Sequence, residues 1–389
     1  MNGDVTNLLC DHDWNQSATE PSLFTKRTKR KGKPDHVSMV LIFVDDLAVA
    51  TTPNNPDHVE LQRLLATRFT VTGGEDIGFY LGCDVHRDRR SRTLTIDQRQ
   101  MILDTCEPYI GTSPRKKTPT VLPTKFIATK DDCPQTEAEQ LKFKHIATEY
   151  RTTIGKLLWI HRCTRPDIGH ALSVLGRYVS NPGKNHVHAL RHVCHYLLNT
   201  VDVCLEYGPD IDNDNIITSY EKVLDPARDQ PDNDLVGYVD ADWATCKDTR
   251  RSQSGFIAIM NGGPIAWTSR KQPIVAMSTM ESELISITAG SLEVVYLRNL
   301  LADLGVTQAQ PTVMLEDNKA TIAVAHNTSI NAASRHIALR HFKVKELIAD
   351  DTIHCQYCPS KFNRADILTK NVDANTLNYH MRRMMGSRT

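Results

Sequence analysis

The second half of the chain alternates between short apolar runs and longer segments with helical periodicity. Residues 236–240 alternate as a strand does, and 255–260 turn through Asn261-Gly262-Gly263 into 264–268, which is a hairpin pattern. Further strands are predicted at 313–315 and 353–358, and helices at 278–305, at 335–350 and around Asp366. The order β-β-β-α-β-α-β-α predicts an α/β domain over 235–389, with a mixed central sheet flanked by helices.

The first half has one clear hairpin. An apolar strand is predicted over 37–44, followed by a turn at Asp45-Asp46 and a second strand over 47–50. The polar residues 1–36 are predicted to be poorly structured except near Pro21-Ser22-Leu23-Phe24. Four prolines between 111 and 146 predict an extended connector. Helical spacing follows at Ile154, Leu157, Leu158, Ile168, Leu172 and Leu175, and Asn181-Pro182-Gly183 ends this helical segment.

Charge and composition narrow the class of protein. The 389 residues hold 46 basic and 46 acidic side chains, so nucleic-acid affinity would have to come from local clusters such as 26–33. Eight acids face two bases between 210 and 234, which predicts a solvated linker over 208–234. Ten cysteines without framework spacing indicate a reducing compartment, the cytoplasm or nucleus. No apolar run approaches ~20 residues, so no membrane span is predicted.

Four acids have positions that suit a metal site. Asp240 and Asp317 follow predicted strands, and Glu283 and Asp366 lie in predicted helices. Singly, each carboxylate suits a helix or turn cap as well as a site. Four carboxylates buried together as anions need cations, and oxygen-only ligands favour Mg²⁺ or Mn²⁺ over zinc.

Two neighbouring acids have alternative interpretations. Ser278 and Glu281 have capping-box spacing, which gives Glu281 a structural explanation that Glu283 lacks. Asp242 lies two residues beyond Asp240 and is the substitute ligand if Asp240 does not bind metal.

Histidine and cysteine spacings offer weaker candidates for zinc. His188, His192 and His195 share one helix face, and Cys355 with Cys358 forms a single CxxC. Neither motif has the further ligands that a zinc site needs. Ordinary surface histidines and a strand that contains two cysteines are the favoured interpretations.

A family resemblance begins at the hairpin. Phe43-Val44-Asp45-Asp46 resembles the aromatic-x-Asp-Asp box of reverse transcriptases, with Asp45 and Asp46 as its polymerase-box acids. Pro21-Ser22-Leu23-Phe24, Phe79-Tyr80-Leu81-Gly82, Tyr150-Arg151 and Thr164-Arg165-Pro166-Asp167-Ile168 resemble segments of copia-type LTR retrotransposon Pol polyproteins. The resemblance implies an α+β palm remnant over 37–110 and a helical thumb or connection over 111–207.

The polymerase motif set departs from that family. Polymerase chemistry needs a third carboxylate upstream, only 44 residues precede Asp45, and Asp11 and Asp13 lie in a context that resembles no such motif. The palm is therefore expected to be truncated and unable to polymerise alone.

A second resemblance covers the C-terminal third. Asp240-Ala241-Asp242-Trp243-Ala244, Arg250 to Gly255, Ser269 to Gln272, Ser278 to Leu284, Asp317-Asn318 and Ala365 to Lys370 resemble, in order, motifs of the copia-type ribonuclease H domain. The resemblance implies an α/β ribonuclease H-like fold. It also implies Asp240, Glu283, Asp317 and Asp366 as catalytic metal ligands.

This resemblance implies hydrolysis of the RNA strand of RNA–DNA hybrids with two Mg²⁺ ions about 4 Å apart, with Mn²⁺ as a substitute. Arg251, Arg270 and Lys271 are candidates for phosphate contacts, and Lys361 lies where many such enzymes carry a histidine. The implied partners are RNA–DNA hybrids, nucleic-acid duplexes and other retrotransposon polyprotein products. The implied location is a cytoplasmic virus-like particle or the nucleus.

Two alternatives to an active nuclease remain. The chain could be a nucleic-acid-binding remnant of a reverse transcriptase that lacks catalysis, or the product of a decayed reading frame. Because drift without selection would be expected to change at least one acid among so many motifs, the intact set favours the nuclease.

Overall fold

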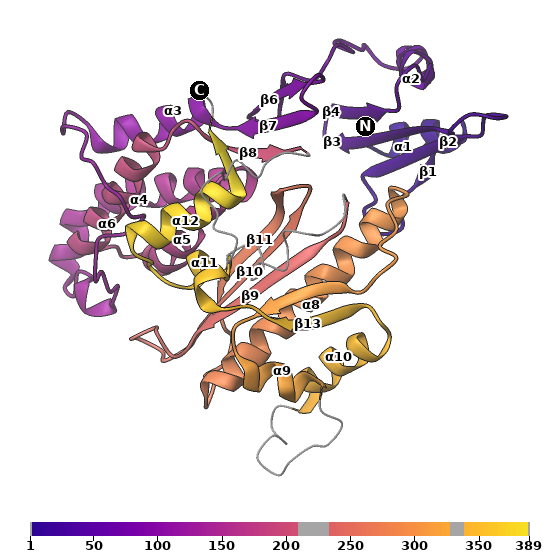
Figure 1. Ribbon diagram of the computed structural model, residues 1–389. Helices are drawn as coiled ribbons and strands as arrows, with labels where there is room; N and C mark the ends of the chain where they lie inside the picture. The colour runs from indigo at the N-terminus through magenta and orange to yellow at the C-terminus, as the bar shows by residue number, and fades with distance from the viewer. Residues whose placement is uncertain (1, 209–232, 327–337, 388–389) are drawn as a thin grey trace. The chain divides into compact units, whose positions relative to one another are not determined.

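The computed structural model describes residues 2–208, 233–326 and 338–387 (Figure 1). The described chain divides into two compact units, residues 1–81 with 295–309 and residues 82–294 with 310–389. The predicted acidic linker, 208–234, lies outside the described residues except at its ends. The predicted domain boundaries differ from these units and stay a prediction.

An antiparallel sheet with two helices forms the first unit. Its strand order is β1 (Asn15–Gln16), β2 (Leu23–Thr28), β3 (His36–Phe43) and β4 (Asp46–Thr51). Helices α1 (Asn2–Cys10) and α2 (Asp57–Ala66) supply the other elements. The core includes Leu9, Trp14, Phe24, Val40 and Leu61. Every second residue of β3 is buried, from His36 to Ile42, whereas the apolar side chains of Leu41 and Phe43 are exposed, so the apolar run predicted a strand but not which of its faces is buried.

The prediction that residues 1–36 are poorly structured is wrong. Strand β2 pairs in register with β3 from Leu23↔Leu41 to Thr28↔His36. Phe24 is fully buried, and Lys26 lies over the Trp14 ring at 5.9 Å from its centroid. The second half of β2 is basic and mostly exposed, so its composition does not indicate a strand. The apolar residues at the start of β2 make its contacts with the core.

The β3–β4 hairpin is confirmed, with its turn one residue earlier than predicted. Phe43 pairs with Asp46, so Val44 and Asp45 are the two turn residues and Asp46 begins β4. Val44 has a φ of 54°, a left-handed conformation that is costly for a β-branched residue.

Helices and a second sheet make up the N-terminal part of the second unit. The long helices are α3 (Arg99–Ile110), α4 (Glu137–Cys163), α5 (Gly169–Leu175) and α6 (Lys184–Asn199). Short 3₁₀ helices cover Lys130–Asp132, Pro166–Ile168 and Gly176–Tyr178, with another at Ser360–Phe362. Thr136 and Glu139 form a capping box that starts α4. The helices predicted from 154 onward are confirmed, although Leu158 is exposed rather than buried. Because α4 already begins at Glu137, the extended connector predicted over 111–146 is wrong from 137 onward.

Within the second unit, the second sheet has the order β14-β8-β7-β6. Its strands are β6 (Cys83–Asp88), β7 (Thr93–Asp97), β8 (Val203–Tyr207) and β14 (Met385–Ser387). Strand β5 (Phe79–Tyr80) lies within the first unit. Helix α12 (Ala374–Met384) leads into β14, which pairs antiparallel with β8 (Figure 1). The sequence pattern did not predict this strand.

The central sheet confirms the predicted mixed architecture. Its order is β11 (Gly263–Lys271), β10 (Gln253–Met260), β9 (Val236–Asp242), β12 (Thr312–Glu316) and β13 (Ile353–Tyr357). Strand β10 runs antiparallel to both β9 and β11, whereas β12 runs parallel to both β9 and β13. The remaining helices are α8 (Thr279–Asp303), α9 (Lys319–His326), α10 (Ala338–Ala349) and α11 (Asp366–Thr369).

Helices pack on both faces of this sheet. A Cβ at Gly290 of α8 would lie 2.6 Å from Val239 and 2.9 Å from Phe256, so α8 packs closely on one face. A Cβ at Gly255 would lie 2.7 Å from Thr369, which places α11 on the opposite face. Trp267 donates from its indole N–H to the His161 carbonyl at 2.9 Å, so the N-terminal helices and the sheet share one unit.

Helix α8 is long and apolar enough, by length and composition alone, to cross a membrane. The sequence analysis missed this stretch. A share of 56% of its most apolar window is buried within the protein, as expected of a helix that packs on a sheet. The apolar composition is therefore weak evidence for a membrane span.

Candidate metal centre at the edge of the central sheet

Three of the predicted acids converge. Asp240 lies near the end of β9, Asp317 directly follows β12, and Glu283 lies in the first turns of α8. One carboxylate oxygen from each lies within 4.8 Å of the other two. Strands β9 and β12 are parallel neighbours, so their carboxyl ends reach the same edge of the sheet. Asp240 and Glu283 are buried, and Asp317 is half-buried.

The fourth predicted acid, Asp366, begins α11 and is buried beside this group. Lys370 follows the same short helix, and its Nζ lies 2.9 Å from Asp366 Oδ1 and 3.7 Å from Asp240 Oδ2. The Thr369 hydroxyl donates to Asp240 Oδ2. A lysine and a threonine of α11 therefore hold two of the acids from one side.

Burial and mutual repulsion favour protons on these carboxyls. Burial, followed by the charges of Glu316 and Asp240, raises the pKa of Glu283 to about 11. Burial and then Asp240 raise the pKa of Asp366 to about 7, against the opposing effect of Lys370. The same two causes raise the pKa of Asp242 to about 6, and they also raise the pKa of Asp317. A divalent cation would remove the repulsion that these shifts express.

Glu316 is an acid of this centre that the sequence analysis missed. It ends β12, is fully buried, and accepts from the Asn318 N–H through Oε1 at 3.0 Å. Its Oε2 and the Oε2 of Glu283 are both buried without a hydrogen-bond partner. Burial, above all, raises the pKa of Glu316. The sequence signal for a buried Glu316 was the presence of two successive acids at a strand end. Since side chains alternate along a strand, one of two successive acids points toward the core.

The two buried oxygens without hydrogen-bond partners, Oε2 of Glu283 and Oε2 of Glu316, indicate whether a metal ion fits this centre. A buried carboxylate oxygen without a donor is costly, and a hard cation with oxygen ligands is the partner that would satisfy it. The residues present therefore fit Mg²⁺ or Mn²⁺. The predicted capping box also separates Glu281 from this group, since the Ser278 hydroxyl accepts from the Glu281 N–H at 3.1 Å and the Glu281 carboxylate accepts from the Met277 N–H at 2.6 Å.

The candidate nucleic-acid contacts lie on the β10–β11 side of the sheet. Arg270 pairs with Ser254 across the two strands and is exposed, and Lys271 pairs with Gln253 and is half-buried. Arg251 is half-buried just before β10. Lys361 lies over the Phe362 ring, 4.5 Å from its centroid, and it is Lys370 that reaches the acids.

The polymerase-box acids lie in a more exposed environment than the acids at the edge of the central sheet. Asp45 and Asp46 are exposed at the β3–β4 turn. Among the described residues, the metal-type group of acids contains neither of them. Asp11 and Asp13 are likewise exposed.

The weaker zinc candidates have structural roles. The His192 ring is hydrogen-bonded to the Thr120 carbonyl at 2.9 Å, and His195 Nδ1 accepts from the Lys116 N–H at 3.4 Å. His188 is exposed. Cys355 and Cys358 are both buried, and no metal-type group among the described residues includes them. The interpretation as surface histidines therefore holds for His188, whereas His192 is half-buried and His195 is buried; Cys355 lies in β13 and Cys358 directly follows it.

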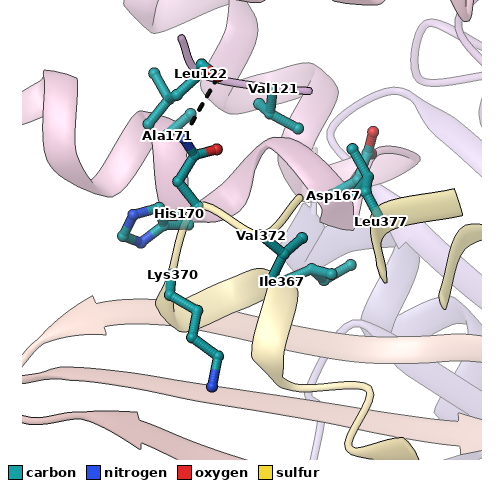
Figure 2. Close-up of a pocket in the computed structure, with 10 residues that line it drawn as sticks. Val121, Leu122, Asp167, His170, Ala171, Ile367, Lys370, Val372 and Leu377 are labelled. Atoms are coloured by element: carbon teal, nitrogen blue, oxygen red, sulfur yellow. Dashed lines mark hydrogen bonds between the residues drawn. The ribbon is translucent and has the colours of Figure 1, made fainter. Parts of the chain in front are cut away.

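A small cavity of about 10 Å³ lies beside α11, between the helices and the sheet (Figure 2). Its wall includes His170, Lys370 and Asn371, and Asn371 donates to the Leu122 carbonyl at 3.4 Å. In Figure 2 the Lys370 stem leaves this wall and its ammonium points away, toward the strands. The cavity has room for about one water molecule and is no substrate site.

The mixed sheet and the acids at its edge agree with the ribonuclease H-like fold that the sequence resemblance implies for the C-terminal part of the chain. The retrovirus-related Pol polyprotein from transposon TNT 1-94 of Nicotiana tabacum is 29% identical over 360 residues, which cover 92% of this chain and 25% of that protein. The corresponding protein from transposon RE1 of Arabidopsis thaliana is 27% identical over 369 residues, 94% of this chain and 22% of that protein. The chain is similar over more than nine-tenths of its length to retrovirus-related Pol polyproteins from transposons, and it spans about a quarter of the length of these relatives.

Other comparisons add shorter or more distant matches. A protein of Plasmopara viticola named secreted RxLR effector protein 161 is 34% identical over 148 residues, 38% of this chain and 90% of that protein. The N-terminal ribonuclease H domain of Rv2228c from Mycobacterium tuberculosis aligns with 38% of this chain and 96% of its own, at 13% identity and a TM-score of 0.28. LC11-RNase H1 in complex with an RNA/DNA hybrid aligns with 35% of this chain and 93% of its own, at 11% identity and a TM-score of 0.27. No family model matches the chain.

Proposed function

We propose that the ribonuclease H-like part of this chain hydrolyses the RNA strand of RNA–DNA hybrids with the help of divalent cations. The observation that carries the proposal is the convergence of Asp240, Glu283 and Asp317 within 4.8 Å at one sheet edge, beside two buried carboxylate oxygens without donors. A structural cluster of this kind would be expected to satisfy its own oxygens with backbone or side-chain donors.

The residues divide the task between them. Asp240, Glu283 and Asp317 would hold a first cation, and Asp366 together with Asp240 would hold a second. Bound Mg²⁺ or Mn²⁺ supplies a stabilising charge for the phosphate and lowers the pKa of attacking water.

The proposed substrate follows from the charges around the centre. Arg251, Arg270 and Lys271 contact phosphates and position the duplex without reading its sequence. Selection of the RNA strand would come from contacts to 2′-hydroxyls across the wide, shallow minor groove. Cleavage should therefore weaken as salt rises, because phosphate contacts release counterions.

The polymerase box carries no such proposal. Asp45 and Asp46 are exposed and belong to no metal-type group of the described residues. A catalytically silent protein that binds hybrids is the alternative function.

The test is cleavage of a hybrid labelled on both strands by the full chain in Mg²⁺, because helices and sheet share one compact unit. Cleavage of the RNA strand alone, abolished by Asp317→Asn, is the expected result. The matched control is Asp350→Asn, which removes an exposed acid at the end of α10. Tight hybrid binding without cleavage by a folded wild-type chain would leave only the binding function.

A further inference from the structure

The cation nearest to the acidic centre is a side chain of the protein itself. Lys370 Nζ lies 2.9 Å from Asp366 Oδ1 and 3.7 Å from Asp240 Oδ2, so its ammonium bridges these two carboxylates. The group with metal-ligand geometry contains Asp240, Glu283 and Asp317. The centre therefore has two halves, one formed by carboxylates alone and one occupied by a lysine.

The two carboxylate oxygens of Asp240 have different partners. Both the Thr369 hydroxyl and Lys370 Nζ contact Oδ2. A carboxylate that serves two ions at once offers an oxygen to each of them. With Oδ2 engaged by two donors, Oδ1 is the oxygen left for a cation.

The backbone that carries Lys370 is firmly anchored. Its N–H donates to the Asp366 carbonyl at 3.2 Å and closes α11. The next residue, Asn371, donates to the Pro123 carbonyl at 3.1 Å. The side chain is freer, because 37% of it is exposed and a lysine stem has four rotatable bonds. The ammonium can thus leave the acids for solvent while its Cα stays in place.

We propose that Lys370 is a built-in competitor for the second divalent cation. Its ammonium holds the position between Asp240 and Asp366, so the centre takes up one ion readily, and a second ion enters only by displacing the lysine. This inference rests on the proposed function and adds a residue that sets how many cations are bound at a given concentration.

The experiment counts Mn²⁺ ions bound to the full chain by electron paramagnetic resonance, alone and with a hybrid whose RNA strand carries 2′-fluoro groups to resist cleavage. The wild type should bind one ion tightly and a second weakly. Lys370→Met should bind the second ion at a Mn²⁺ concentration lower by on the order of tenfold or more, because repulsion by the ammonium is gone.

Two controls separate this role from a general effect of charge or folding. Lys370→Arg keeps the positive charge and should retain weak binding of the second ion. Lys343→Met removes a lysine from another helical ion pair, 3.0 Å from Glu346, and should leave both affinities unchanged. Thermal unfolding of each variant confirms that it is folded before ions are counted.

The outcomes distinguish the two proposals. Equal affinity for the second ion in the wild type and in a folded Lys370→Met would overturn the competitor role while leaving the nuclease intact. Absence of Mn²⁺ binding in every variant, together with no cleavage, would overturn the proposed function and this inference with it.

Discussion

Two groups of buried charged residues in the second unit differ in whether their hydrogen-bond partners are complete. Arg165 and Asp167 form a fully buried pair with bonds of 2.7 and 3.0 Å, and the Tyr196 hydroxyl donates to Asp167 at 2.8 Å. At the sheet edge, by contrast, Glu283 and Glu316 each keep a buried oxygen without a donor. A buried charge whose partners are complete holds a fold together, whereas one whose partners are missing is available for a ligand.

The largest expected effect in a test of this comparison is a loss of stability when the buried Arg165–Asp167 pair is broken. Asp167→Ala leaves Arg165 buried without its counterion, and we expect the free energy of unfolding to fall by about 3–5 kcal/mol. Urea unfolding followed by tryptophan fluorescence measures it. The control, Asp202→Ala, removes the exposed partner of Arg99 and should cost about 1 kcal/mol or less. Equal losses in the two variants would contradict a special role for the buried pair.

The same pair predicts a pH dependence. Although burial opposes ionisation, the charge and hydrogen bonds of Arg165 outweigh it and lower the pKa of Asp167. The contribution of Asp167 to the free energy of unfolding is then fully present above the pKa of about 3.9 that it has in the unfolded chain. It is lost as the pH falls through the lower pKa that Asp167 has in the folded chain. The difference in unfolding free energy between wild type and Asp167→Asn should hold from pH 7 to about pH 4 and shrink below it. A difference that already shrinks near pH 6 would assign it to another group.

A smaller effect tests the sheet edge. Mg²⁺ at ten times its dissociation constant should stabilise the folded chain by about 1.4 kcal/mol, since only the folded state assembles the ligands. A thermal melt with Mg²⁺, compared with one in EDTA, should show a higher midpoint. Glu283→Gln should remove this rise, and the same rise in that variant would place the ion elsewhere.

The smallest effect concerns the exposed acids of the β3–β4 turn. Asp45→Asn and Asp46→Asn should leave both the Mg²⁺-dependent rise in midpoint and hybrid cleavage unchanged, because neither acid belongs to the metal-type group of the described residues. A loss of cleavage in either variant that matches Asp317→Asn would show that the turn takes part in the nuclease.

Sequence reasoning succeeded where local pattern decides the outcome. Strand ends at Asp240 and Asp317 and the capping box of Glu281 all follow from neighbours a few residues away, and the structure has them at the expected places. The convergence of the two strand ends depends on the parallel pairing of β9 and β12, which the sequence pattern did not predict. The catalytic roles of these acids stay a prediction.

The features that sequence reasoning missed depend on tertiary contacts. Glu316 belongs to the acidic centre only because it is buried where its charge acts on Glu283. Lys370 reaches the acids only because α11 packs against β9 and β10. The polar outer half of β2 becomes a strand only because β3 offers its edge. Local propensity carries no information about such partners, which lie far away along the chain.

The pairing of β14 with β8 has a consequence for the order of assembly. Met385 pairs with Leu205, so a neighbour of β8 is supplied by residues 180 positions later. During synthesis the helices of this unit can form early, but their sheet is completed only after the whole ribonuclease H-like part has emerged. Contacts of such long sequence separation slow folding, so the closing of this sheet is expected to be a late and slow step.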